Sequence, residues 1–175
     1  MKPNPPSPKQ PKIPVLGFTG FSGSGKTTIL TQVIRHLEKS GKTVAVIKHS
    51  HHRFDIDKKG KDSYKFRASG AQQVIVASQN RYALMVEKKQ EEPDLTYLIN
   101  KLDLEGLDLI LFEGFKHENY PKIEVHQKSQ ERPLLYPKDS FIIALATDDL
   151  AHPAPIPILD IHDISSIFEF VEQMI

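Results

Sequence analysis

Cysteine is absent from this 175-residue sequence, and no apolar run approaches the length of a membrane-spanning helix. The absence of cysteine excludes disulfides, thiolate metal sites and a cysteine nucleophile, and it fits a cytoplasmic protein. Excess charge is nearly absent too, because 23 Lys and Arg residues face 22 Asp and Glu residues, for a formal net charge of +1. Such a small charge gives no long-range attraction to nucleic acid or to a membrane.

The beginning of the sequence differs from the rest in composition. Six of the 13 prolines fall within residues 1–14, which contain almost no apolar side chains. We therefore expect residues 1–13 to form a disordered leader, with a proline-rich ligand for a partner as the alternative. Residues 14–175 have the length and apolar content of one globular domain.

The most informative segment is residues 20–27, which read Gly-Phe-Ser-Gly-Ser-Gly-Lys-Thr and match the phosphate-binding pattern G-x-x-x-x-G-K-[ST]. An apolar run at residues 15–19 predicts a buried strand before the loop. Apolar residues at helical spacing predict a helix after it, which ends near Gly41. A strand, a glycine-rich loop and a helix together predict a site for a nucleoside triphosphate.

Each residue type in this loop has a physical task. Glycines adopt backbone torsions that let successive N–H groups converge on a phosphate. Lys26 supplies a positive charge for the β- and γ-phosphates, Thr27 offers a hydroxyl to Mg²⁺, and Thr28 adds a contact to the first phosphates. The residues predicted to bind the nucleotide here are Gly20, Ser22, Gly23, Ser24, Gly25, Lys26, Thr27 and Thr28.

The rest of the sequence alternates predicted strands and helices, which is typical of a three-layer α/β fold with a largely parallel sheet, as in P-loop NTPases. Further strands are predicted at residues 43–47, 108–112, 141–146 and 158–159. Residues 73–77 and 82–86 predict two strands joined by a tight turn, and an antiparallel hairpin there would make the sheet mixed. Helices are predicted at residues 62–69 and 95–102. A last helix is predicted after a cap at Asp163, with Ile164, Ile167, Phe168 and Val171 on one face, and we expect the side of Ile164 and Phe168 to pack on the sheet.

Glu113 follows an apolar strand, and ligands of open α/β sheets bind beyond the carboxyl ends of the strands. Its carboxylate suits Mg²⁺ beside the phosphates, or it can orient an attacking water. Glu113 is therefore the predicted catalytic residue and, with Thr27, a predicted metal ligand. Gly114 permits a close backbone approach to the γ-phosphate.

A second polar segment follows the strand at residues 43–47 and contains three histidines. Lys48 and protonated histidines can grip an anionic ligand, and we favour a loop that faces the nucleotide or a substrate over a transition-metal site. If the segment of residues 54–57 is extended, the carboxylates of Asp55 and Asp57 lie on one side of it, where one of them can join the ligands of Mg²⁺. The residues predicted to bind the nucleotide here are Lys48, His49, His51, Asp55 and Asp57.

The third polar strand end is Asp148 with Asp149. A carboxylate at this position accepts hydrogen bonds from the N1–H and the amine of guanine, whereas adenine presents an acceptor at N1. Asp148 is the residue predicted to read the base. Lys116 and Lys122 can support phosphate binding, although solvated lysines are the default.

Together these segments resemble the MobB family of molybdopterin-guanine dinucleotide biosynthesis adaptor proteins. The resemblance covers the chain from residue 14 and rests on residues 20–28, 46–52, 54–57, 60–63, 69–71 and 108–116. It implies a P-loop GTP-binding domain at residues 14–175, a homodimer and weak GTP hydrolysis. It also implies a role beside the MobA guanylyltransferase, which joins GMP to molybdopterin, and a site for molybdopterin itself. The phosphate-loop residues of the family map onto Gly23, Gly25, Lys26, Thr27 and Thr28, and Glu113 falls on its Walker B position.

Two other functions use the same loop. A small-molecule kinase normally needs an arginine-bearing lid over the transferred phosphate, and the sequence between Asp62 and Arg81 offers no long lid. A metal-delivering GTPase is suggested by the clustered histidines, but a soft-metal site is harder to build without cysteine. For GTP hydrolysis itself, Arg67 or Arg81 can supply a positive charge across a dimer interface, and the sequence selects neither.

Overall fold

The computed structural model describes residues 13–50, 55–87 and 92–175. The chain folds into two compact units, a larger one formed by residues up to His49 and from Leu95 onward, and a smaller one formed by residues 50–94. Nearly all of the predicted leader lies outside the described residues, and so do His51 and His52. That residues 14–175 form one GTP-binding domain stays a prediction. No helix in the described part of the chain is long and apolar enough to cross a membrane.

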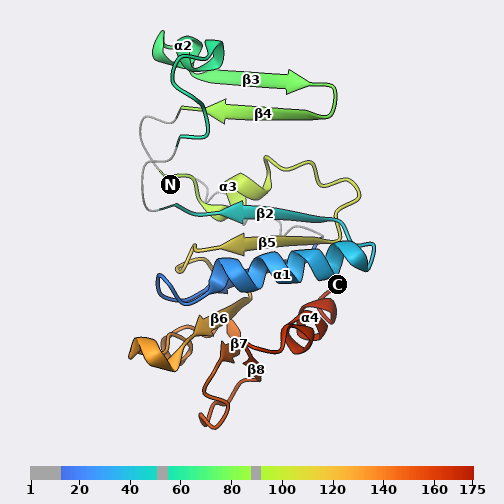
Figure 1. Cartoon of the computed structure of the whole chain (residues 1–175), viewed down its shortest axis with the longest axis vertical. Helices are drawn as coiled ribbons and strands as arrows, with labels where there is room; N and C mark the ends of the chain where they lie inside the picture. The colour runs from blue at the N-terminus through green and yellow to red at the C-terminus, as the bar shows by residue number, and fades with distance from the viewer. Residues whose placement is uncertain (1–12, 51–54, 88–91) are drawn as a thin grey trace, which may run out of the picture. The chain divides into compact units, whose positions relative to one another are not determined.

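The larger unit is built on a six-stranded sheet in the order β2-β5-β1-β6-β7-β8 (Figure 1). The strands are β1 (Val15–Thr19), β2 (Val44–Lys48), β5 (Leu109–Glu113), β6 (Lys122–His126), β7 (Ile142–Thr147) and β8 (Ile158–Asp160). Every neighbouring pair in this sheet is parallel. The predicted α/β fold is confirmed, and the carboxyl ends of all six strands lie at one edge.

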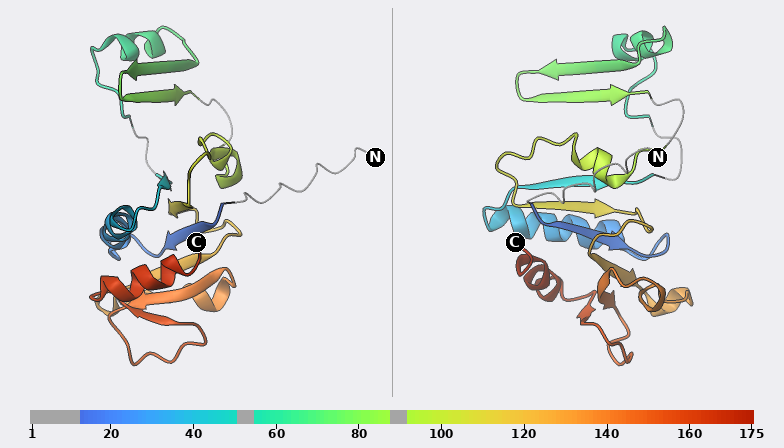
Figure 2. Two further views of the ribbon diagram at one scale, coloured as in Figure 1. Left: turned by 90° about the vertical axis from the view of Figure 1, so that its right-hand side faces the viewer. Right: turned by 180° about the vertical axis from the view of Figure 1, so that it is seen from behind.

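Helices cover both faces of this sheet, which confirms the three layers (Figure 2). α1 (Lys26–Lys39) and α4 (Ile164–Glu172) pack on one face, where their apolar residues join Leu16, Phe18 and Val125 in one core cluster. On the other face α3 (Leu95–Ile99) packs over a second cluster that includes Ile110 and Phe112. Two 3₁₀ turns, η1 (Lys128–Gln130) and η2 (Tyr136–Lys138), follow β6.

The contact between β1 and β5 depends on a glycine. Gly17 stands beside Phe112 in the parallel register, and the Phe112 ring lies over the Gly17 backbone. A Cβ atom at position 17 would lie 2.2 Å from Cζ of that ring. Phe112 is fully buried, so its ring fills the space that a side chain at position 17 would need.

The last helix begins as predicted and packs the predicted face on the sheet. The Asp163 carboxylate accepts a hydrogen bond from the Ser165 N–H, so the predicted cap is confirmed. Of the four apolar residues on that face, Ile167 and Val171 are fully buried, and Ile164 and Phe168 are partly buried against the same core cluster. The predicted packing of this face is confirmed.

Strand β6 was not predicted at all. A central strand of a parallel sheet normally reads as a continuous apolar run, and β6 instead contains Lys122, Glu124 and His126. Lys122 and Glu124 are each only 1% exposed, because partners distant in sequence satisfy their charges. Such partners leave no local signal in the sequence.

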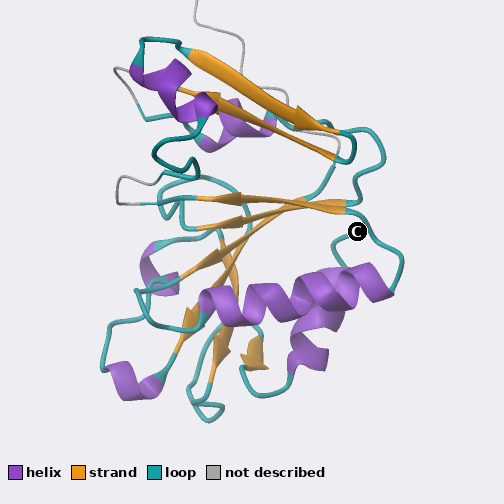
Figure 3. Ribbon diagram, turned by 45° about the horizontal axis from the view of Figure 1, so that its top comes forward, coloured by secondary structure: helices purple, strands orange, loops and turns teal. Residues whose placement is uncertain are grey.

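The smaller unit consists of α2 (Asp62–Ala68) and an antiparallel hairpin of β3 (Gln73–Ser78) and β4 (Arg81–Val86), with α2 packed along the hairpin (Figure 3). The predicted hairpin is confirmed, but it forms a separate two-stranded sheet and does not make the main sheet mixed.

Candidate functional site

The glycine-rich loop at residues 20–27 connects β1 to α1 at the carboxyl edge of the sheet. Gly20 has φ of 138°, and a Cβ there would lie 2.3 Å from the Val125 carbonyl oxygen of β6. Gly25 has φ of 92° and caps the N-terminus of α1. Both positions require glycine, so the loop can turn tightly beside β6 and direct the first N–H groups of α1 to one point.

The other loop residues divide into exposed and buried ones. Ser22, Gly23, Thr27 and Thr28 are exposed or half-buried, whereas Ser24 is 1% exposed. The Ser24 Oγ atom is buried and has no hydrogen-bond partner among the described residues. A buried hydroxyl without a partner costs free energy, and a phosphate oxygen in the loop is the acceptor that would relieve this cost.

Lys26 lies inside the loop and donates from Nζ to the Phe21 carbonyl oxygen at 2.7 Å. Burial lowers the pKa of this ammonium, and the neighbouring charges of Lys116 and Lys48 lower it further, while the Glu113 carboxylate opposes them. Lys26 therefore lies among positive charges that an anion would balance.

The Phe21 ring in the same loop attracts two further cations. Lys116 Nζ lies 4.9 Å and Arg132 Cζ 5.6 Å from the ring centroid. Both distances are within the range of a cation–π contact. The loop therefore has a positively charged rim that its own motif does not encode.

Thr27 and Glu113 meet directly, although 86 residues separate them. Thr27 Oγ1 donates to Glu113 Oε1 at 2.8 Å, and Lys48 Nζ lies 3.3 Å from Glu113 Oε2. The pairing of β1, β5 and β2 brings the loop and helix that follow β1, which carry Thr27, beside the ends of β5 and β2, which carry Glu113 and Lys48. A hydroxyl and a carboxylate side by side at a phosphate loop are oxygen donors that suit Mg²⁺.

His49 packs against the strand end that carries Glu113. Its N–H donates to the Glu113 carbonyl oxygen at 2.9 Å, and its ring lies 4.9 Å from the Phe115 ring. A Cβ at Gly114 would lie 2.8 Å from the His49 Cβ, so Gly114 makes this approach possible. In the part of the chain that the structure describes, no three His, Asp or Glu side chains are grouped to hold a metal ion.

Asp55 and Asp57 belong to the smaller unit, where both bind one guanidinium. Arg67 Nη1 lies 2.9 Å from Asp55 Oδ1 and 3.3 Å from Asp57 Oδ2, and Arg67 Nε lies 2.7 Å from Glu87 Oε1. The Asp57 N–H and Arg67 lower the pKa of the Asp55 carboxyl. The predicted common side of the two carboxylates agrees with this arrangement, and their role in an Mg²⁺ shell stays a prediction.

Asp148 follows β7 and is tied to the turn η1. Its Oδ1 accepts the Lys128 N–H at 2.8 Å, and the Lys128 ammonium lies 3.0 Å from Asp149 Oδ2. The carboxylate of Asp148 is thus held at the same edge of the sheet as the loop, where its predicted contact with a base remains a prediction.

Sequence reasoning missed two glutamines that support the loop. Gln127 Nε2 donates to the Ser24 carbonyl at 3.4 Å, and Gln130 Nε2 donates to the Ser22 carbonyl at 3.3 Å. No motif marks them. Their position directly after β6, the neighbour of β1, would have indicated them if that strand had been recognised.

Lys122 was expected to be solvated or to support a phosphate, and this was wrong. It is 1% exposed, pairs with Asp139 Oδ2 at 2.7 Å and donates to the carbonyl oxygens of Lys116 and Glu118 at 3.0 and 2.8 Å. Glu124, two residues further along β6, accepts the N–H groups of Leu135 and Tyr136, while burial raises the pKa of its carboxyl. These contacts fix the segments that follow β5 and β6.

Comparison with known proteins agrees with this geometry. Residues 15–148 match the family model for molybdopterin guanine dinucleotide synthesis protein B, MobB. The molybdopterin-guanine dinucleotide biosynthesis adapter protein of Escherichia coli (strain K12) is 45% identical over 86% of this chain and 86% of its own. The adapter protein of Haemophilus influenzae is 42% identical over 86% of this chain and 83% of its own. The crystal structure of Bacillus subtilis MobB covers 93% of this chain and 99% of its own, with 27% identity and a TM-score of 0.74. The chain therefore belongs to the MobB family.

Proposed function

We propose that this chain is an adaptor in molybdopterin guanine dinucleotide synthesis that binds GTP with Mg²⁺ and hydrolyses it slowly at most. The names of its relatives support the pathway. The contact between Thr27 and Glu113 beside Lys26 carries the nucleotide part of the proposal. It unites a loop hydroxyl with the carboxylate at the end of a neighbouring strand, as a phosphate-bound Mg²⁺ requires.

Each group has one task in this proposal. The N–H groups of residues 23–28 and the Lys26 ammonium hold the β- and γ-phosphates, while Thr27 and Glu113 hold Mg²⁺. A bound Mg²⁺ neutralises part of the phosphate charge. Glu113 also orients water, and Lys48 balances its charge at 3.3 Å.

Slow hydrolysis is supported by the glutamines that contact the loop. The side-chain amides of Gln127 and Gln130 donate to loop carbonyls, so these donors serve the loop itself. GTP then serves as a carried ligand, delivered to a MobA-type guanylyltransferase that consumes it.

Guanine selectivity is assigned to Asp148, whose carboxylate can accept from guanine and not from the N1 of adenine. A hydrogen bond to a charged group contributes about 1.5–3 kcal/mol, so we expect GTP to bind roughly 10- to 100-fold more tightly than ATP. Calorimetric titration with each nucleotide, with and without Mg²⁺, measures this ratio. Asp148→Asn should reduce it, and Asp62→Asn, an exposed carboxylate of the smaller unit, should not.

Equal affinity for the two nucleotides would remove the guanine assignment and favour a kinase. In the same titrations, Glu113→Gln should abolish most of the gain in affinity that Mg²⁺ gives the native chain. A full Mg²⁺ effect in that variant would exclude Glu113 as a ligand.

The hairpin of the smaller unit supports a homodimer. Paired residues of β3 and β4 alternate between its two faces, and α2 packs beside the face that contains buried Val74. The opposite face leaves four large apolar residues exposed, and these are Ile75, Tyr82, Leu84 and Val86, while Val76 is exposed on the face of Val74. A two-stranded hairpin is marginally stable alone, and an apolar surface of this kind is one that a second copy of the same hairpin would cover.

Leu84→Glu should shift the protein from dimer to monomer in analytical ultracentrifugation, because it places a charge in the apolar surface. Lys59→Glu, an exposed change in the same unit, is the control and should leave the dimer intact. A native chain that sediments as a monomer at all concentrations would contradict the homodimer.

A further inference from the structure

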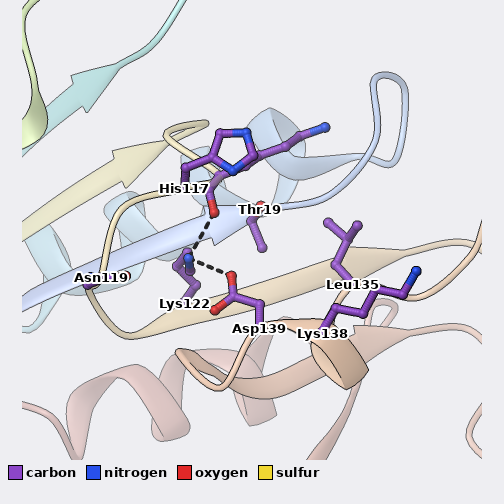
Figure 4. Close-up of a pocket in the computed structure, with 8 residues that line it drawn as sticks. Thr19, His117, Asn119, Lys122, Leu135, Lys138 and Asp139 are labelled. Atoms are coloured by element: carbon purple, nitrogen blue, oxygen red, sulfur yellow. Dashed lines mark hydrogen bonds and ion pairs between the residues drawn. The ribbon is translucent and has the colours of Figure 1, made fainter.

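A cavity of about 320 Å³ lies beside β1 and β6, on the face of the sheet opposite α1 and α4 (Figure 4). Phe18 and Val125 belong to the core under α1, so the alternation along each strand turns Thr19 and Lys122 to the other face. Both of these residues line the cavity. The segments after β5 and β6 provide the rest of its wall, and none of the residues assigned above to GTP or Mg²⁺ lines it.

The floor of the cavity contains a hydroxyl without a partner in the described structure. Thr19 is 1% exposed, and its Oγ1 atom makes no hydrogen bond with any described residue. A buried hydroxyl without a hydrogen-bond partner costs free energy, and valine, which has nearly the same shape as threonine, would avoid that cost. Valine also favours strands as strongly as threonine does. The folded chain alone gives no reason for a hydroxyl here, which indicates a ligand that bonds to it.

The walls carry an excess of positive charge. Lys116 and Lys138 line the cavity, and no carboxylate in the described segments pairs with either ammonium. His117 and the Asn119 amide add further hydrogen-bond donors at the rim. The only carboxylate of the lining that the structure describes, Asp139, is already bound to Lys122 at 2.7 Å.

Lys122 makes this arrangement rigid. Its buried ammonium joins Asp139 to the backbone carbonyls of Lys116 and Glu118, so it fixes the segment that carries Lys116, His117 and Asn119 above Thr19 (Figure 4). A cavity whose donors are held in place before binding loses less free energy in ordering them.

We propose that this cavity binds the phosphate group of a small phosphomonoester, as a second anion site separate from the glycine-rich loop. A phosphate accepts several hydrogen bonds and carries close to two negative charges, which matches the ammonium groups of Lys116 and Lys138 and a buried hydroxyl. The volume exceeds that of phosphate alone and lies at the small end of the range for ligand pockets, so it also holds part of the esterified molecule.

Lys116 connects this cavity to the nucleotide site. It lines the cavity while its ammonium lies over the Phe21 ring, and its charge acts on Lys26. A phosphomonoester in the cavity and a triphosphate at Lys26 would therefore both lie near Lys116. The cavity is suited to the second, phosphorylated ligand of a protein that already holds a nucleotide.

The test is an NMR titration of the full ¹⁵N-labelled chain with glycerol 2-phosphate, in a Lys26→Ala background that disables the glycine-rich loop. We expect saturable shifts of the amides of Thr19, Asn119 and Leu135. Thr19→Val should weaken this binding by roughly 10-fold or more, because a hydrogen bond to a charged group is lost. It should leave the melting temperature equal or higher, because the removed hydroxyl has no partner among the described residues.

Lys138→Gln is a second variant, at an exposed position. It should weaken the binding of glycerol 2-phosphate in the Lys26→Ala background. In the chain that keeps Lys26, it should leave the affinity for GTP unchanged. Lys39→Gln, an exposed lysine of α1, is the matched control. Absence of saturable shifts at the cavity, or unchanged affinity in both cavity variants, would overturn the proposal. If inorganic phosphate binds more than about 10-fold more tightly than glycerol 2-phosphate, the cavity is a site for free phosphate. That result would overturn the proposal of a phosphomonoester. Because the titration does not need the loop, its result is independent of whether GTP binds.

Discussion

Lys26→Ala is expected to lower the affinity for Mg²⁺–GTP by about 3 kcal/mol or more, roughly 100-fold or more. The ammonium is the charge inside the glycine-rich loop, and hydrogen bonds to charged groups contribute about 1.5–3 kcal/mol each. Its present acceptor, the Phe21 carbonyl at 2.7 Å, marks the position from which it reaches a phosphate. Calorimetric titration of the variant measures the loss directly.

Lys39→Ala is the control for this variant. Lys39 is an exposed lysine in the last turn of the same helix, so its removal changes the net charge equally and leaves the loop unaltered. GTP affinity in the Lys39 variant should stay within about 3-fold of the native value. A Lys26→Ala chain that also stays within this range would show that the loop is not the triphosphate site.

Phe112→Ala is expected to lower the free energy of unfolding of the larger unit by about 3–5 kcal/mol. The ring is fully buried in the core under α3 and lies over the Gly17 backbone, so its removal leaves a cavity between β1 and β5. Urea unfolding measures the change. Phe141→Ala serves as the comparison, because that ring is 38% exposed and its loss should cost much less.

A substitution at Gly17 tests the contact with Phe112 independently. Gly17→Ala alone should destabilise the native chain by about 1–3 kcal/mol, since the new methyl group meets the Phe112 ring. In the Phe112→Ala background the same methyl group enters the vacated space and should cost far less. Additive effects in this double-mutant cycle would refute the contact between the two residues.

The parts of the fold and site that the sequence predicted are those with a local signal. β1, the glycine-rich loop and α1 follow from an apolar run, a fixed motif and helical spacing, all close together in the chain. Glu113 follows from a continuous apolar strand that ends in one acid. Parallel pairing then brings it to Thr27, as the rule for carboxyl ends of strands predicts.

The parts that were missed depend on contacts that no local pattern in the sequence marks. β6 contains buried charges, which read as surface residues until Asp139 and the carbonyls of Lys116 and Glu118 are known to surround Lys122. The glutamines at 127 and 130 carry no motif, and the cavity beside Thr19 joins segments from separate places in the chain. Contacts of this kind follow only from the assembled fold.

The contact between Lys26 and the Phe21 carbonyl also bears on the entropy of binding. A free lysine side chain holds about 2 kcal/mol of rotamer entropy, which a ligand must normally overcome when it orders the chain. In this loop the ammonium already has an acceptor and a defined position before a phosphate arrives. An incoming phosphate exchanges one acceptor for another, so much of that ordering cost has been met during folding and does not weaken the affinity.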